Sequence, residues 1–305
     1  GGARAGASPV ADQGRRMTGQ TSSAPRSVLS ISSRDNALIQ LIRKLSQDAT
    51  AYRKLGQVWL EGDHLGLAAR DRGRCLGRAV IAESVWLGEH GRAQTADPHA
   101  IHLTQLACRA DEVVVVPDAL WRHFSGLDTP ARIGFLTSLV SIQSDHSGAS
   151  SGVRPGVPTV VLDRVQDAGN VGSILRTAAA MGVRQVLALK GTAALWSAKV
   201  LRAGMGAHFG LHLVEQALPD DLVALQLACV ATSLQTPHTL TSLTLPTPCA
   251  WVFGHEGQGV APEVLARCEW QVRIPQPGGE ESLNVAAAAA ICLYESMRQG
   301  AHGRP

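Results

Sequence analysis

An asparagine and an arginine, both able to hydrogen-bond a substrate, lie six residues apart in the segment 163–182. The segment reads DRVQDAGNVGSILRTAAAMG, and after Asn170 its apolar residues recur at helical spacing. Asn170 stands where a helix N-cap is expected, so capping alone could explain it. Arg176 lies off the apolar stripe, and its guanidinium stays protonated and offers five N–H donors. A surface ion pair is its simplest structural role, so this segment alone does not decide between structure and chemistry.

A second segment, 251–260, runs from an apolar strand into a loop with three glycines. Its sequence is WVFGHEGQGV, with Gly254, Gly257 and Gly259 surrounding Glu256. Glycines at this density predict tight backbone turns or close approach of the backbone to a ligand. Glycine-rich turns after strands are common, so this segment is also weak evidence when it is taken alone.

The third segment, 274–290, reads IPQPGGEESLNVAAAAA and passes from a strand through a proline- and glycine-rich loop into a helix. Ser282 and Asn284 precede that helix, and either could simply cap it. The alanine run 286–290 allows another backbone to pack very close.

Elements around these segments alternate between short apolar strands and helices. Strands without polar alternation are typical of a parallel sheet that is covered on both faces. We therefore predict an α/β fold for the second half. Its predicted strands are 159–162, 186–189, 211–214, 228–231, 250–253 and 271–274, and its predicted helices are 171–181, 194–202, 261–267 and 283–298.

In the front half, strands that alternate with helices predict a smaller α/β domain over 28–143. Ser33 is a plausible N-cap for a helix through Leu38 and Leu45, and 144–157 is rich in Ser and Gly and predicts a linker. Residues 1–27 lack periodicity and predict a disordered tail. The other expected elements are strands at 57–60, 79–82 and 113–116 and a helix at 98–110.

Charge divides unevenly between the two halves. Residues 1–78 carry 13 Lys/Arg and 6 Asp/Glu, whereas the remainder carries 15 and 19. This distribution indicates that the front half meets a polyanion. The six cysteines form no CxxC pair, which argues against a zinc site and suits a reducing compartment. No apolar run approaches the length of a membrane helix, and we expect a cytoplasmic protein without a metal.

Taken together, in this order and spacing, the three segments resemble the signature motifs of the SpoU/TrmH family of RNA 2′-O-ribose methyltransferases. The resemblance spans about residues 158–298. It implies a knotted methyltransferase domain over 158–305 with a mostly parallel sheet and a trefoil knot, a homodimer, and S-adenosylmethionine as cofactor. The front half is similar to the family's L30e-like substrate-binding domain, through ISSRDNALIQLIRKL and WLEG.

The resemblance also implies roles for individual residues. Backbone groups at Gly254, Ile274 and Leu283 would hold the cofactor, and Thr232 and Ser233 would line the same pocket. Glycine- and proline-rich loops suit that task because main-chain groups can reach an adenine edge there.

Catalysis in the family is assigned to an arginine, which corresponds to Arg176. It would act either as a base assisted by RNA phosphate or by stabilising the developing alkoxide. Asn170 would position the ribose or the Arg176 loop, and Glu256 would anchor Arg176 or a basic group across the dimer. Ser282 and Asn284 would hydrogen-bond around the reacting centre. Many relatives have Ser where this chain has Ala286, a position we assign to packing.

Two alternatives remain at this stage. The chain could be an RNA-binding member of the fold that has lost catalysis, or it could modify tRNA instead of ribosomal RNA. The intact motif residues favour an enzyme, and the accessory front domain favours ribosomal RNA of the 23S type by analogy. The stretch 204–210 has GxGxxxG spacing rather than that of a dinucleotide fingerprint, which argues against a dehydrogenase.

Overall fold

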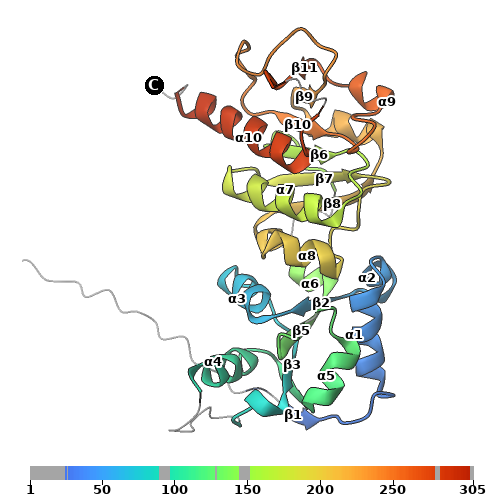
Figure 1. The fold of residues 1–305 in the computed structure, drawn as a ribbon, viewed down its shortest axis with the longest axis vertical. Coiled ribbons are helices and arrows are strands. Elements are labelled where there is room, and N and C mark those ends of the chain that lie inside the picture. The colour runs from blue at the N-terminus through green and yellow to red at the C-terminus, as the bar shows by residue number, and fades with distance from the viewer. Residues whose placement is uncertain are drawn as a thin grey trace, which may run out of the picture.

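Two β-sheets, one from each half of the chain, organise the structure (Figure 1). The computed structural model describes residues 25, 27–88, 97–127, 129–143, 152–278 and 282–302. The predicted tail therefore lies outside the described residues except for positions 25 and 27. Residues 144–151 of the predicted linker lie outside them as well. Residues 152–157 contact the second sheet, because the Arg154 amide donates to Gln185 Oε1 and the Gly156 amide donates to the Leu225 carbonyl.

The front sheet has five strands in the order β1-β4-β3-β5-β2. Strand β5 runs antiparallel to β2 and β3, while β1, β4 and β3 are parallel. Strand β5 was not predicted, because Gly134 interrupts its apolar run. The glycine is needed there, since a Cβ would lie 2.3 Å from the Trp59 ring. The strands are β1 (Ser27–Ser30), β2 (Gln57–Glu61), β3 (Arg78–Ala82), β4 (Glu112–Val116) and β5 (Ile133–Ser138).

Helices pack on this sheet, with α3 and α4 in contact with each other and α1 in contact with α5. The predicted N-cap Ser33 is wrong, because the Asn36 side chain accepts from the Leu38 amide at 2.9 Å and caps α1. Ser33 instead accepts from the amide of Asp35. The helices are α1 (Ala37–Gln47), α2 (Ala51–Leu55), α3 (Asp63–Asp71), η1 (Glu83–Val85), α4 (Pro98–Ala107), α5 (Asp118–Phe124) and α6 (Leu139–Gln143).

The second sheet has six strands, all parallel, in the order β11-β9-β10-β6-β7-β8. Each predicted strand is present. The strands predicted at 159–162 and 250–253 have those same bounds, and the other four have ends that differ by up to three residues. The predicted fold class, mixed α/β with a mostly parallel sheet, is therefore confirmed. The strands are β6 (Thr159–Leu162), β7 (Gln185–Leu189), β8 (His212–Ala217), β9 (Cys229–Thr232), β10 (Ala250–Phe253) and β11 (Trp270–Val272).

Both faces of this sheet are buried, as the unbroken apolar strands predicted. On β10, Trp251 and Phe253 join the apolar cluster of α7, α8 and α10, while Ala250 and Val252 join the cluster around η3 and α9. The predicted helix at 194–202 begins only at Ala198, because Ser197 is its N-cap. The elements are α7 (Ala168–Ala180), α8 (Ala198–Gly204), η2 (Ala207–Gly210), η3 (Pro219–Leu225), α9 (Pro262–Leu265) and α10 (Val285–His302).

Helix α8 lies between the two sheets (Figure 1) and contacts α1 and β2. Buried side chains from both halves, including Tyr52, Trp59, Trp196 and Phe209, belong to one continuous apolar cluster. The two halves therefore share a core rather than meeting through a polar surface. Among the described residues, no helix combines the length and apolar character required to cross a membrane.

Candidate functional site

Four neighbouring parallel strands bring the candidate segments to one edge of the second sheet. β6, β10, β9 and β11 end at Leu162, Phe253, Thr232 and Val272. Because parallel strands end at the same edge, the segments that begin after them meet there, where ligands bind in open α/β sheets. This edge is the candidate site.

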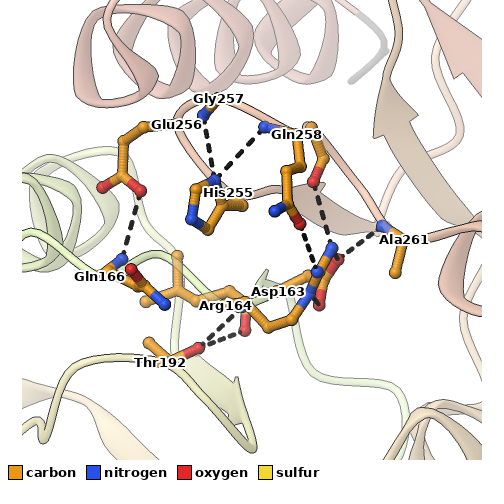
Figure 2. Close-up of polar contacts among 11 residues, drawn as sticks. Asp163, Arg164, Gln166, Thr192, His255, Glu256, Gly257, Gln258 and Ala261 are labelled. Carbon is orange, nitrogen blue, oxygen red and sulfur yellow. Dashed lines mark hydrogen bonds and ion pairs between the residues drawn. The ribbon is translucent and has the colours of Figure 1, made fainter.

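A buried carboxylate joins the first two segments. Asp163, which is 2% exposed, accepts a hydrogen bond from the Ala261 amide at 2.7 Å and pairs with Arg164 Nε at 3.0 Å. Arg164 also donates to Gln258 Oε1 at 3.0 Å (Figure 2). The hydrogen bond that Arg164 donates to Asp163 raises the pKa of its guanidinium. This pair was not predicted. The signal was an aspartate that ends the apolar strand VVLD, since buried charges are normally paired.

The glycine loop after β10 is a tight turn. The amides of His255 and Gly259 each donate to the other residue's carbonyl, at 3.0 and 2.8 Å, and Gly259 has φ 68°. A Cβ on Gly254 would lie 2.2 Å from the Gly259 carbonyl carbon. His255 Nδ1 accepts from the Gly257 amide at 3.0 Å (Figure 2). Gly254 and Gly259 therefore serve the backbone turn, one of the two roles predicted for the glycines.

Glu256 projects from this loop onto the first segment. Its carboxylate accepts from the Gln166 amide at 3.3 Å (Figure 2). It also accepts from the Asp167 amide at 3.1 Å and from the Asn170 side chain at 3.2 Å. Partial burial alone would raise the pKa of Glu256. Hydrogen bonds from its own amide, from Asp167, from Asn170 and from Gln166 outweigh burial and lower that pKa. The carboxylate is thus held ionised between the two segments.

Asn284 connects the third segment to the same group. Its Nδ2 donates to Asn170 Oδ1 at 3.0 Å, while its Oδ1 accepts from the amides of Ala286 and Ala287 at 2.9 and 3.3 Å. Asn284 therefore caps α10 and contacts Asn170 at the same time. The side-chain hydrogen-bond network Glu256–Asn170–Asn284 joins all three segments.

The alternative that Asn170 merely caps the helix is wrong. Helix α7 begins at Ala168, and its N-cap is Asp167, whose Oδ1 accepts from the Asn170 amide at 2.7 Å. Asn170 and Gly169 therefore lie in the first helical turn rather than in a loop. The side chain of Asn170 is consequently free to bridge Glu256 and Asn284.

Arg176 is not part of this hydrogen-bond network. It lies on the exposed face of α7 with Gly169 and Ser173, and in the described part of the chain it makes no hydrogen bond or ion pair. Ser282 and Leu283 are also exposed. The structure thus brings Asn170, Glu256 and Asn284 together, and it leaves Arg176 and Ser282 facing outward.

The remaining candidates lie at the ends of β9 and β11. The Ser233 amide donates to the Val272 carbonyl at 3.0 Å, and Thr232 stands opposite Val272 in register. Ile274 follows, half-buried against the core. Close by in sequence, Gln276 Oε1 is buried and has no hydrogen-bond partner among the described residues. An orphaned buried acceptor in the segment after β11 fits a ligand that carries N–H donors, such as a nucleoside.

No group of three or more His, Cys, Asp or Glu residues that could hold a metal occurs within the ranges that the structure describes.

Comparison with known proteins identifies the family. Residues 158–294 match the model of the SpoU rRNA methylase family. A protein of Synechocystis named as an uncharacterized tRNA/rRNA methyltransferase is 33% identical over 276 residues, which are 89% of this chain and 94% of that protein. The chain belongs to the SpoU rRNA methylase family, and the predicted family is confirmed.

Two further relatives cover the chain to different extents. The 23S rRNA (guanosine-2′-O-)-methyltransferase RlmB of Nitrosomonas europaea is 39% identical over 145 residues, which are 46% of this chain but only 55% of that protein. The crystal structure of an AdoMet-bound rRNA methyltransferase from Sinorhizobium meliloti superposes with a TM-score of 0.71 at 24% identity, over 91% of this chain and 99% of that one. The latter likeness shows a shared fold across both sheets.

Proposed function

We propose that this chain transfers a methyl group from S-adenosylmethionine to a ribose 2′-hydroxyl of RNA, with 23S-type ribosomal RNA as the substrate. The observation that carries the proposal is the hydrogen-bond network Glu256–Asn170–Asn284, which joins all three segments at the sheet edge. The chain is a member of this methylase family. The names of the relatives, which include ribosomal RNA 2′-O-methyltransferases, support the same reaction.

The cofactor would be held by main-chain groups at Gly254, Ile274 and Leu283, with Thr232 and Ser233 lining its pocket. When bound, S-adenosylmethionine supplies an electrophilic methyl group. The tight turn at Gly254 keeps that backbone in one conformation, and the buried acceptor on Gln276 could receive an N–H donor. A site organised before binding lowers the entropy cost of aligning two reactants.

Arg176 would act on the ribose oxygen. It is exposed on α7 and makes no competing contact among the described residues. A guanidinium in this state can bind an RNA phosphate and stabilise negative charge that develops on the oxygen. Asn170, Glu256 and Asn284 would act as a brace that fixes the start of α7, and Ser282 would hydrogen-bond near the reacting centre.

A homodimer is part of the proposal. Ile291, Tyr294 and Met297 on α10 are exposed, and Leu240 and Thr241 line a hollow beside the first two. Apolar side chains gathered on one helix face are typical of a protein interface. We also propose that the C-terminal part of the second sheet forms a trefoil knot, as the family resemblance implies, and that the protein is cytoplasmic.

The front half, residues 28–143, would be an L30e-like domain that binds RNA, joined by the segment 144–157 to the methyltransferase domain at 158–305. Its support is the basic excess of its first part, residues 28–78, which carry 9 Lys/Arg and 5 Asp/Glu. Affinity for RNA should then fall with increasing salt, because bound phosphates release counterions.

A methylation assay tests the proposal. The purified chain is incubated with methyl-labelled S-adenosylmethionine and either protein-free large-subunit ribosomal RNA or total tRNA, and the RNA is digested and analysed by mass spectrometry. We expect the label on a ribose of ribosomal RNA. Label on a base would refute the reaction, label on tRNA alone would refute the substrate, and no label with either RNA would refute catalysis.

A further inference from the structure

Strand β8, at the edge of the second sheet, contains a β-bulge that includes the acidic residue Glu215. Leu187 pairs with Val214 and Leu189 with Ala217, so one residue of β7 faces two of β8. Gln216, one of these two, has φ 58°, a left-handed conformation that is costly for a residue with a side chain. Bulges redirect neighbouring side chains, and such strain persists where surrounding contacts hold it. The other bulged residue is Glu215.

The carboxylate of Glu215 receives donors from both halves of the chain. The Tyr52 hydroxyl lies 2.6 and 2.7 Å from its two oxygens, and Arg53 Nη2 lies 2.9 Å from Oε1. The Leu195 amide donates to Oε1 at 2.9 Å. Burial and the charge of Glu215 raise the pKa of Tyr52, so its hydroxyl remains a donor at any physiological pH.

The Tyr52 contact is shielded from water, whereas the Arg53 side chain is 31% exposed. The Tyr52 residue is 2% exposed and the Glu215 side chain 13%. Hydrogen bonds to an ionised partner in such a setting are stronger than neutral ones and demand a defined geometry. Domains within one chain move relative to each other unless their interface is large and apolar. The apolar contacts in the shared core are non-directional. The hydrogen bonds to Glu215 therefore add contacts that depend on how the two halves are oriented.

Other close contacts join the two halves of the chain. Arg74 Nη2 donates to the Phe209 carbonyl at 3.0 Å, and Arg202 Nη1 donates to the Gly126 carbonyl at 3.4 Å. A Cβ on Gly206 would lie 2.3 Å from the Ala68 side chain, so the two halves approach closely there. The contact between the halves thus includes several fixed points besides Glu215.

We infer that Glu215 is a positioning residue, which through Tyr52 and Arg53 locks the front domain in one orientation on the methyltransferase domain. RNA bound by the front domain would then reach the candidate site at a fixed distance and angle. The inference rests on the proposed function for its consequence, but the lock itself is a property of the protein alone. Glu215 is not proposed to touch the RNA or the cofactor.

Hydrogen exchange on the full chain, without RNA or cofactor, tests the lock. In Glu215→Ala the Leu195 amide loses its acceptor, and we expect its exchange to accelerate by at least about tenfold, together with exchange in η2. Tyr52→Phe keeps the ring packing and should loosen η2 to a smaller degree. The control Glu112→Gln removes an ion pair with Arg78 inside the front sheet and should leave both segments unchanged. Wild-type exchange at Leu195 and η2 in Glu215→Ala would overturn the inference.

Kinetics test the consequence. With protein-free large-subunit ribosomal RNA, we expect the KM for RNA to rise about tenfold in Glu215→Ala and about threefold in Tyr52→Phe, with kcat and the KM for S-adenosylmethionine within about twofold of wild type. With a short oligoribonucleotide that carries only the methylated position, the variants should match wild type. An unchanged KM for the long RNA, or an equal loss on the short one, would overturn the positioning role. If wild type methylates no RNA, the proposed function fails, and the exchange experiment still decides whether the lock exists.

Discussion

Replacing Gly254 by alanine should distort the backbone turn of the candidate site, although it adds only one methyl group. The new Cβ would lie 2.2 Å from both the Gly259 carbonyl carbon and the Val260 amide nitrogen. Nonbonded carbon atoms prefer about 3.5–4.0 Å, so one side of the turn must move by more than about 1 Å. Both atoms belong to the backbone, so no side-chain rotation can relieve the contact.

The cost follows from what the movement breaks. Overpacking costs about 1–3 kcal/mol, and the two hydrogen bonds between His255 and Gly259 contribute about 1 kcal/mol each. We expect a loss of about 2–5 kcal/mol, which corresponds to a fall in Tm of about 3–8 °C for a protein of this size. Because Gly254 is proposed to hold the cofactor, affinity for S-adenosylmethionine should fall by at least about tenfold.

Thermal unfolding and calorimetric titration with S-adenosylmethionine measure the two effects. Gly257→Ala is the matched control from the same loop, since its nearest neighbour is the His255 ring at 3.9 Å and its φ is not positive. That variant should stay within about 0.5 kcal/mol of wild type. A Gly254→Ala protein with the Tm and cofactor affinity of wild type would refute the reasoning.

Three further predictions concern the reaction and the pH dependence of stability. Arg176→Ala should abolish RNA methylation, as measured by label transfer, with unchanged Tm and cofactor affinity; activity near wild type would remove Arg176 from the mechanism. Glu256→Gln should lower kcat by about tenfold or more, because one of its two acceptor oxygens becomes a donor that faces amide groups. Adding Asn170→Ala to this variant should lower kcat little further. Additive losses of kcat would contradict the proposal that Glu256 and Asn170 act together to fix the start of α7. His208 is fully buried, and burial lowers its pKa to about 4 from the ordinary 6.5, so between these values the unfolded chain binds a proton that the folded chain does not. Its contribution to stability is therefore complete above pH 6.5 and declines by about 3 kcal/mol as pH falls toward 4, a dependence that chemical denaturation should detect in wild type and not in His208→Gln. Parallel pH profiles for the two proteins would show that another group is responsible.

Local patterns predicted much of the second sheet. The strand at 250–253 was recognisable because its four apolar residues are bounded by a glycine loop, and it occupies the residues expected. Parallel pairing then places the three segments at one edge without any knowledge of side-chain contacts. Helix starts were harder, since Asp167 and Asn170 are both good capping residues and only the backbone geometry selects the first.

Contacts between distant residues could not be predicted in the same way. Asn170 and Asn284 are 114 positions apart, and neither side chain carries a signal for its partner. Strand β5 was missed because Gly134 weakens its pattern, although Trp59 on the neighbouring strand requires that glycine. The contacts of the bulged residue Glu215 were not predictable either, since Tyr52 lies 163 positions away in the sequence.

A crystal structure of the chain with S-adenosylmethionine tests the central claim most directly. The account predicts the donor at the sheet edge, in contact with the main chain at Gly254, Ile274 and Leu283, with its methyl group open to the side from which Arg176 can reach a ribose. A donor bound elsewhere on the chain, or crystals that never take it up at saturating concentration, would contradict the account.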